Sequence, residues 1–210
     1  ARTDAIANRE WVRRIVRSAV AAGVTQFLDI GSGLPTRRNV HEVAQWHDPS
    51  ARVAYYDNDP MVVAHGRHLF AANQQTRYVE ADAHDFKTVL ADAAELLDFD
   101  QPIIVMMASI LHHIPAGDDP SGLVANYVAA LPSGSLLAIS QPSGDDNDQK
   151  MFDLANGRHG GNVTLRGASS IKALFGGLRL LKPGLVDVQQ WRPDRERPPS
   201  SRFLGGLAEV

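Results

Sequence analysis

Short apolar runs alternate with helical patterns along the first 140 residues, and this alternation restricts the fold more than any other feature of the sequence. Strands that alternate with helices at such spacing favour a parallel sheet built from βα units. The run PIIVMM is apolar at almost every position, as expected when helices cover both faces of a sheet. We therefore expect an α/β fold, a Rossmann-like doubly wound sheet. The strand-like runs cover residues 26–30, 51–57, 76–82, 102–107 and 135–140.

Helix signals lie between these runs. Apolar residues from Val12 to Ala19 follow the spacing of one helix face, and Gly23 marks the end of that first helix. Asp59, followed by a proline, is typical of a helix cap, and Asp85 is a second cap candidate. Further helices are predicted over residues 85–97, 121–131 and 169–175.

The last third of the chain has a less regular pattern. We interpret it as a polar loop over 144–148, a turn at Gly160-Gly161, a strand-like run over 186–191, an exposed Pro-rich connection over 195–201 and a final strand over 202–210. We expect the final strand to complete the sheet. The pair Gly205-Gly206 predicts a β-bulge in it.

Composition excludes several classes of protein. The 210 residues fit one domain, with an N-terminal helix in 1–22, a binding core in 23–142 and a C-terminal half in 143–210 that completes the sheet. Cysteine is absent, which excludes disulfides and a Cys nucleophile. With a net charge of -3 and no cluster of basic residues, no nucleic-acid partner is expected. No apolar run approaches the roughly 18 residues of a membrane span, so we expect a cytoplasmic protein without membrane contact.

The chemistry of such a sheet is sought at the carboxyl ends of its strands. The first strand ends in Asp29-Ile30-Gly31-Ser32-Gly33-Leu34-Pro35, where two glycines allow a sharp turn and close approach to a ligand. Asp57 ends the second strand, 24 positions after Gly33 (57 minus 33), a spacing suited to an acid that binds a ribose diol. Pro35 stands near the place of a third glycine, which weakens the case for a pyrophosphate site.

Acidic residues also end the third strand. Asp82, in the segment Glu80-Ala81-Asp82-Ala83-His84-Asp85, is placed to accept a hydrogen bond from an adenine amino group, although the cluster also reads as a helix cap. Acids at successive strand ends, without Lys or Arg in the turns, fit a nucleoside ligand that carries no phosphate. S-adenosylmethionine is such a ligand.

The fourth strand is followed by Ala108-Ser109-Ile110-Leu111-His112-His113, a loop expected to face the reactive centre. His112 is the candidate catalytic residue, as a base or as a group that orients an acceptor. The alternative is a packed histidine bonded to the backbone. No metal site is predicted, because His65 and His68 lack further ligands at suitable spacing.

With these residues in place, the chain resembles a known family. The order LDIGSGLP, YYDNDP, EAD and LHHIP is similar to the class I S-adenosylmethionine-dependent methyltransferases. More narrowly, it resembles the actinobacterial S-adenosyl methyltransferase group, formerly a domain of unknown function (DUF574). The longer strings that support this resemblance cover residues 8–14, 26–45, 51–65, 96–115 and 183–194.

The resemblance implies a mostly parallel sheet whose C-terminal strand lies antiparallel beside the fifth. It also implies a role for each motif. Gly31, Ser32 and Gly33 would wrap the methionine end of the cofactor, and Asp57 would hold its ribose. Further cofactor contacts implied at the strand ends are Asp29, Asn58, Asp82, Ala83, Ala108 and Ser109. Asn39 and His41 belong to a motif of the family, and their role is inferred from position alone. The Leu-Leu-Gly-Gly-Lys-type N-terminal motif of the group is absent here, so the resemblance supplies the cofactor and not the acceptor.

We therefore expect a methyltransferase that uses S-adenosyl-L-methionine to methylate an O or N atom of a small molecule. Two alternatives stay open at this point. One is a protein that binds S-adenosylmethionine without transferring its methyl group. The other is a nicotinamide-dependent oxidoreductase, which Pro35 and the lack of a Tyr-x-x-x-Lys pair disfavour.

Overall fold

The computed structural model describes residues 2–156, 163–195, 198–199 and 201–210, and its centre is an eight-stranded sheet. The strand order is β3-β2-β1-β4-β5-β8-β6, with β7 paired to β8. All strands from β1 to β5 run parallel, whereas β8 runs antiparallel to β5. The strands are β1 (Gln26–Ile30), β2 (Arg52–Asp57), β3 (Thr76–Glu80), β4 (Ile103–Ala108), β5 (Leu136–Pro142), β6 (Arg179–Leu180), β7 (Val186–Asp187) and β8 (Phe203–Glu209).

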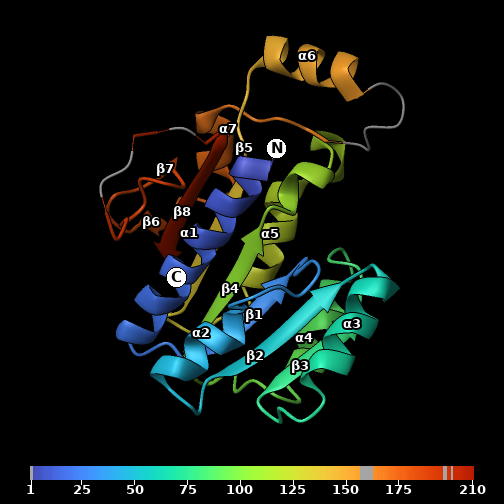
Figure 1. The fold of residues 1–210 in the computed structure, drawn as a ribbon, viewed down its shortest axis with the longest axis vertical. Helices are drawn as coiled ribbons and strands as arrows, with labels where there is room; N and C mark the ends of the chain where they lie inside the picture. Colours follow the sequence, from blue (N-terminus) through green and yellow to red (C-terminus); the bar gives the residue numbers. More distant parts are fainter. Residues whose placement is uncertain (1, 157–162, 196–197, 200) are drawn as a thin grey trace.

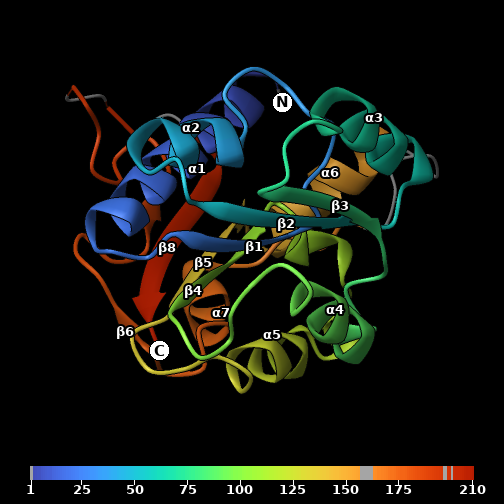
Figure 2. The ribbon, with the colours of Figure 1, turned by 90° about the horizontal axis from the view of Figure 1, so that it is seen from below.

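Helices cover both faces of this sheet, as the doubly wound prediction requires (Figures 1 and 2). Figure 2 shows α1, α2 and α3 over one face and α4, α5 and α7 over the other, with α6 at the top of Figure 1, apart from both layers. The helices are α1 (Arg2–Ala21), α2 (Val40–His47), α3 (Pro60–Phe70), α4 (Phe86–Ala93), α5 (Pro120–Val128), α6 (Asp146–Asn156) and α7 (Ala168–Ala173). Short 3-10 turns lie at η1 (Leu111–His113) and η2 (Ala116–Asp118).

The alternation of side chains along β1 explains the two layers. Phe27 points to the core under α1 and α2, whereas Leu28 and Ile30 point to the core under α4 and α5. All five residues of β1 are buried, because β2 and β4 flank it and helices cover both of its faces. A strand with no exposed position favours apolar residues on both faces, and in β1 only Gln26 and Asp29 depart from this rule.

The end of α1 follows from Gly23. This residue has φ +85°, a conformation that costs little only for glycine. Its N–H donates to the carbonyl of Val20, and the Val24 N–H donates to that of Ala19, both at about 3 Å. These two bonds form a Schellman cap, which turns the chain directly into β1. The predicted helix end is therefore confirmed.

Several predicted elements differ from the structure. The stretch 144–148 is not entirely a loop, because α6 begins at Asp146. The strand-like run 186–191 is a strand only over the two residues of β7, where Val186 pairs with Gly205 and Asp187 with Leu204. Helix α4 ends at Ala93 rather than at 97, and β3 ends at Glu80 rather than at 82. The turn at Gly160-Gly161 and residues 196–197 and 200 of the Pro-rich connection lie outside the described residues.

The structure also contains an element that the sequence analysis lacked, helix α2. Its start carried a recognisable signal, because Asn39 and Glu42 have the spacing of a capping box. The Glu42 carboxylate accepts a 2.7 Å hydrogen bond from the Asn39 N–H. The amide of Asn39 bonds both main-chain groups of Thr36, which fixes the loop before the helix.

The final strand is confirmed as antiparallel to β5, but the bulge predicted at Gly205-Gly206 is wrong. The register pairs Ser140 with Gly205 and Ile139 with Gly206 without an extra residue. Both glycines serve packing instead. A Cβ on Gly205 would lie 2.8 Å from the ring of Trp11, a fully buried side chain of α1.

Gly205→Ala should therefore destabilise the fold, because the new methyl group overlaps an indole that has no room to move. We expect a loss of roughly 1–3 kcal/mol in the free energy of unfolding, as for other overpacked cores. Urea denaturation measures it. Gly117→Ala is the matched control, since nothing lies within 4 Å of the Cβ it would add. Equal stability of both variants would contradict the packing role of Gly205.

Candidate active site

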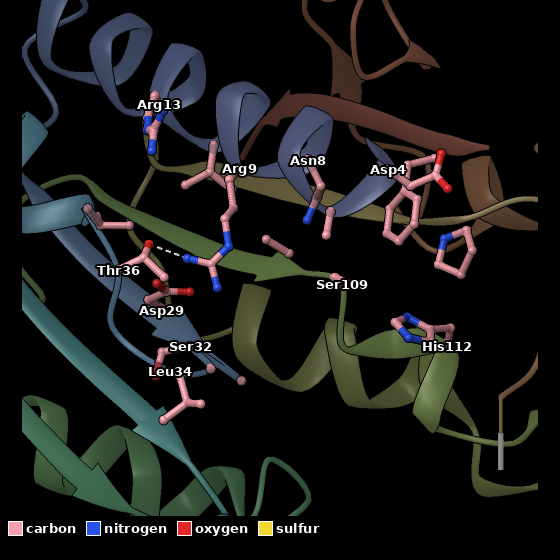
Figure 3. Close-up of a pocket in the computed structure, with 18 of the residues that line it drawn as sticks. Asp4, Asn8, Arg9, Arg13, Asp29, Ser32, Leu34, Thr36, Ser109 and His112 are labelled. Atoms are coloured by element: carbon pink, nitrogen blue, oxygen red, sulfur yellow. Dashed lines mark hydrogen bonds between the residues drawn. The ribbon is translucent and has the colours of Figure 1, made fainter. Parts of the chain in front are cut away.

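A cavity of about 820 Å³ opens at the carboxyl ends of β1 and β4, under the N-terminal half of α1 (Figure 3). It takes in eight of the sequence-predicted residues, which come from the stretch that runs from β1 to α2 and from the stretch that runs from β4 to η1. These residues are Asp29, Gly31, Ser32, Gly33, Asn39, Ala108, Ser109 and His112. The sheet order explains their meeting, because β1 and β4 are neighbours whose following segments diverge.

The glycine turn after β1 forms one wall. Gly31 and Gly33 have φ +70° and +65°, so both positions favour glycine. A Cβ on Gly31 would lie 2.5 Å from the side chain of Ile110 in the loop after β4. The N–H groups of Gly31 and Ser32 both donate to the Tyr56 carbonyl, at 2.8 and 3.1 Å. The turn is thus held against β2 and pressed against the β4 loop.

Asp57 anchors this turn from the end of β2. One of its carboxylate oxygens accepts the Gly33 N–H at 2.8 Å, and the other accepts the Asp59 N–H at 3.0 Å. The residue is half-buried and stands behind the turn, outside the lining of the cavity. Asp59 caps α3 as predicted, through a 2.8 Å bond from the Met61 N–H.

Asp29 is a buried acid at the floor of the cavity, 7% exposed. Burial, with a smaller contribution from the negative charge of Asp57, raises the pKa of Asp29 to about 7. No described residue donates a hydrogen bond to its carboxylate, so nothing in the described chain stabilises the charged form. A carboxyl that titrates near neutral pH inside a cavity is a feature of functional sites.

The end of β4 carries backbone strain. Ser109 has φ +66°, an uncommon value for a residue with a side chain. Its N–H donates to the carbonyl of Ser140 at 2.7 Å, which ties the strained residue to β5. Non-glycine residues in this conformation persist where the surrounding structure holds them, often at ligand sites.

His112 lies on the far side of the cavity, in η1. It is 7% exposed, and its Nδ1 has no hydrogen-bond partner among the described residues. Burial, together with the positive charges of His113 and Arg166, lowers the pKa of His112 to about 3. The imidazole is therefore neutral at physiological pH. His113, beside it, is more exposed.

Arg166 holds the His112 loop and was not singled out from the sequence. Its guanidinium donates to the carbonyls of Leu111 and Ile114 at 2.8 and 2.6 Å, and the side chain is buried. The Thr164 N–H adds a 2.7 Å bond to the His112 carbonyl. Arg166 comes from a segment more than fifty residues beyond the loop, with no local pattern to connect the two.

Helix α1 supplies the roof of the cavity, also unforeseen in the sequence analysis. Figure 3 shows Arg9 reaching from α1 across the cavity to Thr36, with which it forms a hydrogen bond. Asn8 accepts a 2.6 Å hydrogen bond from the buried Ser140 hydroxyl. Both residues belong to the string NREWVRR, whose polar residues on a helix otherwise read as a solvated face.

Other predicted residues lie outside the cavity. Asn58 follows Asp57 and is exposed. The Asp82 carboxylate accepts 2.8 Å bonds from the N–H and the ring of His84, which lowers its pKa. Ala83 is fixed by a 2.9 Å bond from the Tyr127 hydroxyl to its carbonyl. These residues continue the row of strand ends from β2 to β3.

His41 is buried and shares a 2.8 Å bond with the Tyr55 hydroxyl.

The described residues contain neither a membrane span nor a metal-binding cluster. No described helix has the length and apolar character of a membrane span. Within the same ranges, no group of three His, Asp or Glu side chains has the arrangement of a metal site.

Comparisons with known proteins agree with this geometry. The sequence profile of the family described as S-adenosyl methyltransferase matches residues 1–209. A crystal structure of a proposed methyltransferase from Thermobifida fusca shares 36% identity with a TM-score of 0.91, over 99% of this chain and 81% of that one. A DUF574 family protein from Streptomyces avermitilis shares 36% identity with a TM-score of 0.87, over 97% and 82% of the two chains.

More distant structures share the fold. An O-methyltransferase family protein from Burkholderia thailandensis has 14% identity and a TM-score of 0.64, over 96% of this chain and 55% of that one. No curated protein matches the sequence. The match along nearly the whole chain and the two structures at 36% identity place this protein in the S-adenosyl methyltransferase family, as an S-adenosylmethionine-dependent methyltransferase.

Proposed function

We propose that the cavity under α1 binds S-adenosylmethionine and that the enzyme methylates an oxygen or nitrogen atom of a small molecule held beside His112. The observation that carries this proposal is the glycine turn after β1, fixed by the Asp57 carboxylate and forming a wall of the cavity. When bound, S-adenosylmethionine supplies a methyl group on a sulfonium, ready for transfer to a nucleophile.

The residues present fit this cofactor. The volume of about 820 Å³ lies in the range of small-molecule sites. Gly31 and Gly33 let the backbone approach a ligand without a Cβ in the way. The Ser32 hydroxyl is buried without a hydrogen-bond partner among the described residues, although buried polar groups are normally bonded. A ligand bound in the turn would give the Ser32 hydroxyl its missing hydrogen-bond partner.

The row of strand ends supports a set of cofactor contacts. Gly31, Ser32 and Gly33 hold the methionine end, and Asp29 faces its ammonium group. Asp57 binds the ribose, Asn58 stands beside the adenine, and the adenine edge lies at the end of β3. The remaining proposed contacts are Asn39, Asp82, Ala83, Ala108 and Ser109.

The acceptor side is formed by apolar and aromatic groups. Phe203, Phe152 and Leu165 line the cavity on the same side as His112. The rings of His112 and Phe203 are edge to face, with centroids 6.4 Å apart. Such walls suit a small, partly apolar acceptor and exclude water from it.

The same proposal places the enzyme in the cytoplasm.

His112 orients the acceptor in this proposal. A general base works best with a pKa near the working pH, and the pKa of His112 is about 3, so it is a weak base. A neutral imidazole with an unpartnered nitrogen still accepts or donates one hydrogen bond. Holding the acceptor in line with the methyl group lowers the entropic part of the barrier.

The direct test is incubation of the enzyme with methyl-labelled S-adenosylmethionine and a broad small-molecule extract. We expect a labelled product, and its absence in every extract, despite tight cofactor binding, would favour a protein that binds without transferring. With the acceptor found, His112→Ala should lower kcat by about tenfold to a hundredfold and leave S-adenosylhomocysteine affinity unchanged. Full activity of that variant would remove the proposed role.

Asp57→Ala should weaken S-adenosylhomocysteine binding by roughly ten- to thirtyfold. A charge-assisted contact is worth about 1.5–3 kcal/mol, water that enters the gap restores part of this so that the lower half of the range applies, and each 1.4 kcal/mol is tenfold. The loss of its bond to Gly33 adds to the effect. Calorimetry measures it. Asp59→Ala is the control, and as a cap it should cost about 1 kcal/mol of stability with little change in affinity. A folded Asp57→Ala protein with unchanged affinity would refute the ribose assignment.

The pKa of Asp29 predicts how the stability of the ligand-free protein depends on pH. This pKa is raised to about 7 in the folded state from an ordinary 3.8, so between these values the folded state binds more protons than the unfolded state. The free energy of unfolding must therefore fall as pH rises through that window. We expect a loss on the order of 2–4 kcal/mol from pH 4 to pH 8.

Asp29→Asn removes this loss, because the amide carries no charge to desolvate. Urea denaturation at several pH values should show a flatter profile for Asp29→Asn than for the wild type. Asp100→Asn, at an exposed carboxylate, is the matched control and should keep the wild-type slope. Parallel profiles for all three proteins would contradict the buried, neutral state of Asp29.

A further inference from the structure

A second cavity of about 740 Å³ lies between α1, α2 and the segment that follows β7. It is separate from the glycine turn, although Arg13 and Arg38 line both cavities. Five arginines and three carboxylates line it, which is an excess of positive charge in a chain whose net charge is -3. The charge of this cavity is thus a local feature and not a property of the whole surface.

All three carboxylates already have partners. Glu42 accepts the Asn39 N–H at the start of α2, and Asp194 pairs with Arg17 at 2.7 Å. In contrast, no described carboxylate pairs with Arg38 or Arg195, and the Arg13 guanidinium donates to the Arg37 carbonyl. Within the described residues, positive charge is therefore in excess at this surface.

The positive charges gathered at this cavity disfavour the charged form of Arg13. Its Nε is buried without a hydrogen-bond partner among the described residues. Burial and the neighbouring guanidiniums of Arg38 and Arg9 lower the pKa of Arg13, an effect that Glu10 and Glu42 oppose only in part. Arg38 itself has φ +61°, so strained backbone holds it beside Arg13. Like charges gathered in this way are stabilised by an anion placed between them.

Trp46, near the end of α2, gives the cavity an aromatic wall. It is 85% exposed, the highest value among the large hydrophobic side chains of the described residues. The cation–π contact recorded in the described chain joins Arg192 to Trp191, and no guanidinium is recorded over the Trp46 ring. An exposed indole beside free guanidiniums offers a stacking surface for a planar ring.

We propose that this second cavity binds a small molecule that carries both a planar ring and phosphate groups, as a nucleoside diphosphate does. The guanidiniums of Arg13, Arg38 and Arg195 hold the phosphates, and the ring stacks on Trp46. Several unpaired guanidiniums call for more than one negative charge, which favours a phosphate over a single carboxylate. A concave site of this volume favours a small ligand over a protein surface.

The three tryptophans make the test direct. Trp11 and Trp191 are fully buried, so changes in tryptophan emission on ligand stacking report on Trp46. The protein is first saturated with S-adenosylhomocysteine to fill the cavity under α1, and ADP is then titrated. We expect saturable quenching, displacement of ADP by pyrophosphate, and binding of adenosine at least tenfold weaker than that of ADP.

Variants separate this site from the first cavity. Arg38→Asn removes the charge but tolerates the left-handed backbone, and it should weaken ADP binding at least fivefold. Lys87→Gln, an exposed change of the same charge on α4, is the matched control and should leave ADP affinity unchanged. Trp46→Leu, followed by calorimetry, should weaken ADP roughly tenfold without altering S-adenosylhomocysteine affinity.

Three outcomes would overturn the proposal. One is a lack of saturable quenching while S-adenosylhomocysteine is bound. Another is equal ADP affinity in Arg38→Asn and Lys87→Gln. The third is ADP binding that S-adenosylhomocysteine abolishes, which would mean that ADP enters the cavity under α1. None of these results bears on the methyltransferase activity, so the two proposals fail separately.

Discussion

The hydrogen bond from the Gly33 N–H to the Asp57 carboxylate joins the two strand ends on which the candidate site is built. The turn after β1 needs positive φ at Gly31 and Gly33, and such a turn has few intrinsic preferences of its own. Asp57 and the Tyr56 carbonyl hold it in one conformation from the neighbouring strand. The cavity wall is held in place for this reason.

The two ends of the chain then close the cavity together. Trp11 of α1 packs on Gly205 of β8, which the absence of a side chain at that position permits. Arg14 donates to the carbonyls of Trp191 and Val188, so the segment before β8 is held by the same helix. Because α1 is fixed in this way, Arg9 and Asn8 project over the glycine turn and the end of β5.

Burial sets the charge states inside the cavity. It raises the pKa of Asp29 and lowers that of His112, so both groups favour their neutral forms near neutral pH. The cavity as a whole is not free of charge, because Arg9 reaches across it to Thr36, beside Asp29 (Figure 3). Two further arginines of its lining, Arg13 and Arg38, also line the second cavity.

The sequence by itself determined the βα alternation, the parallel core, the end of α1 at Gly23 and the helix caps at Asp59 and Asp85, since these follow from periodicity and from residues that act on their neighbours. It also pointed to the strand ends where the candidate site lies. Only the tertiary structure decided that Gly205 packs on Trp11 without a bulge, that Arg166 holds the His112 loop and that Arg9 reaches over the cavity. Each of these contacts joins residues that are far apart in the chain, so no pattern among neighbouring residues predicts it. The pKa values of Asp29 and His112 belong to the same class, because burial is a property of the packed molecule and not of the residue type.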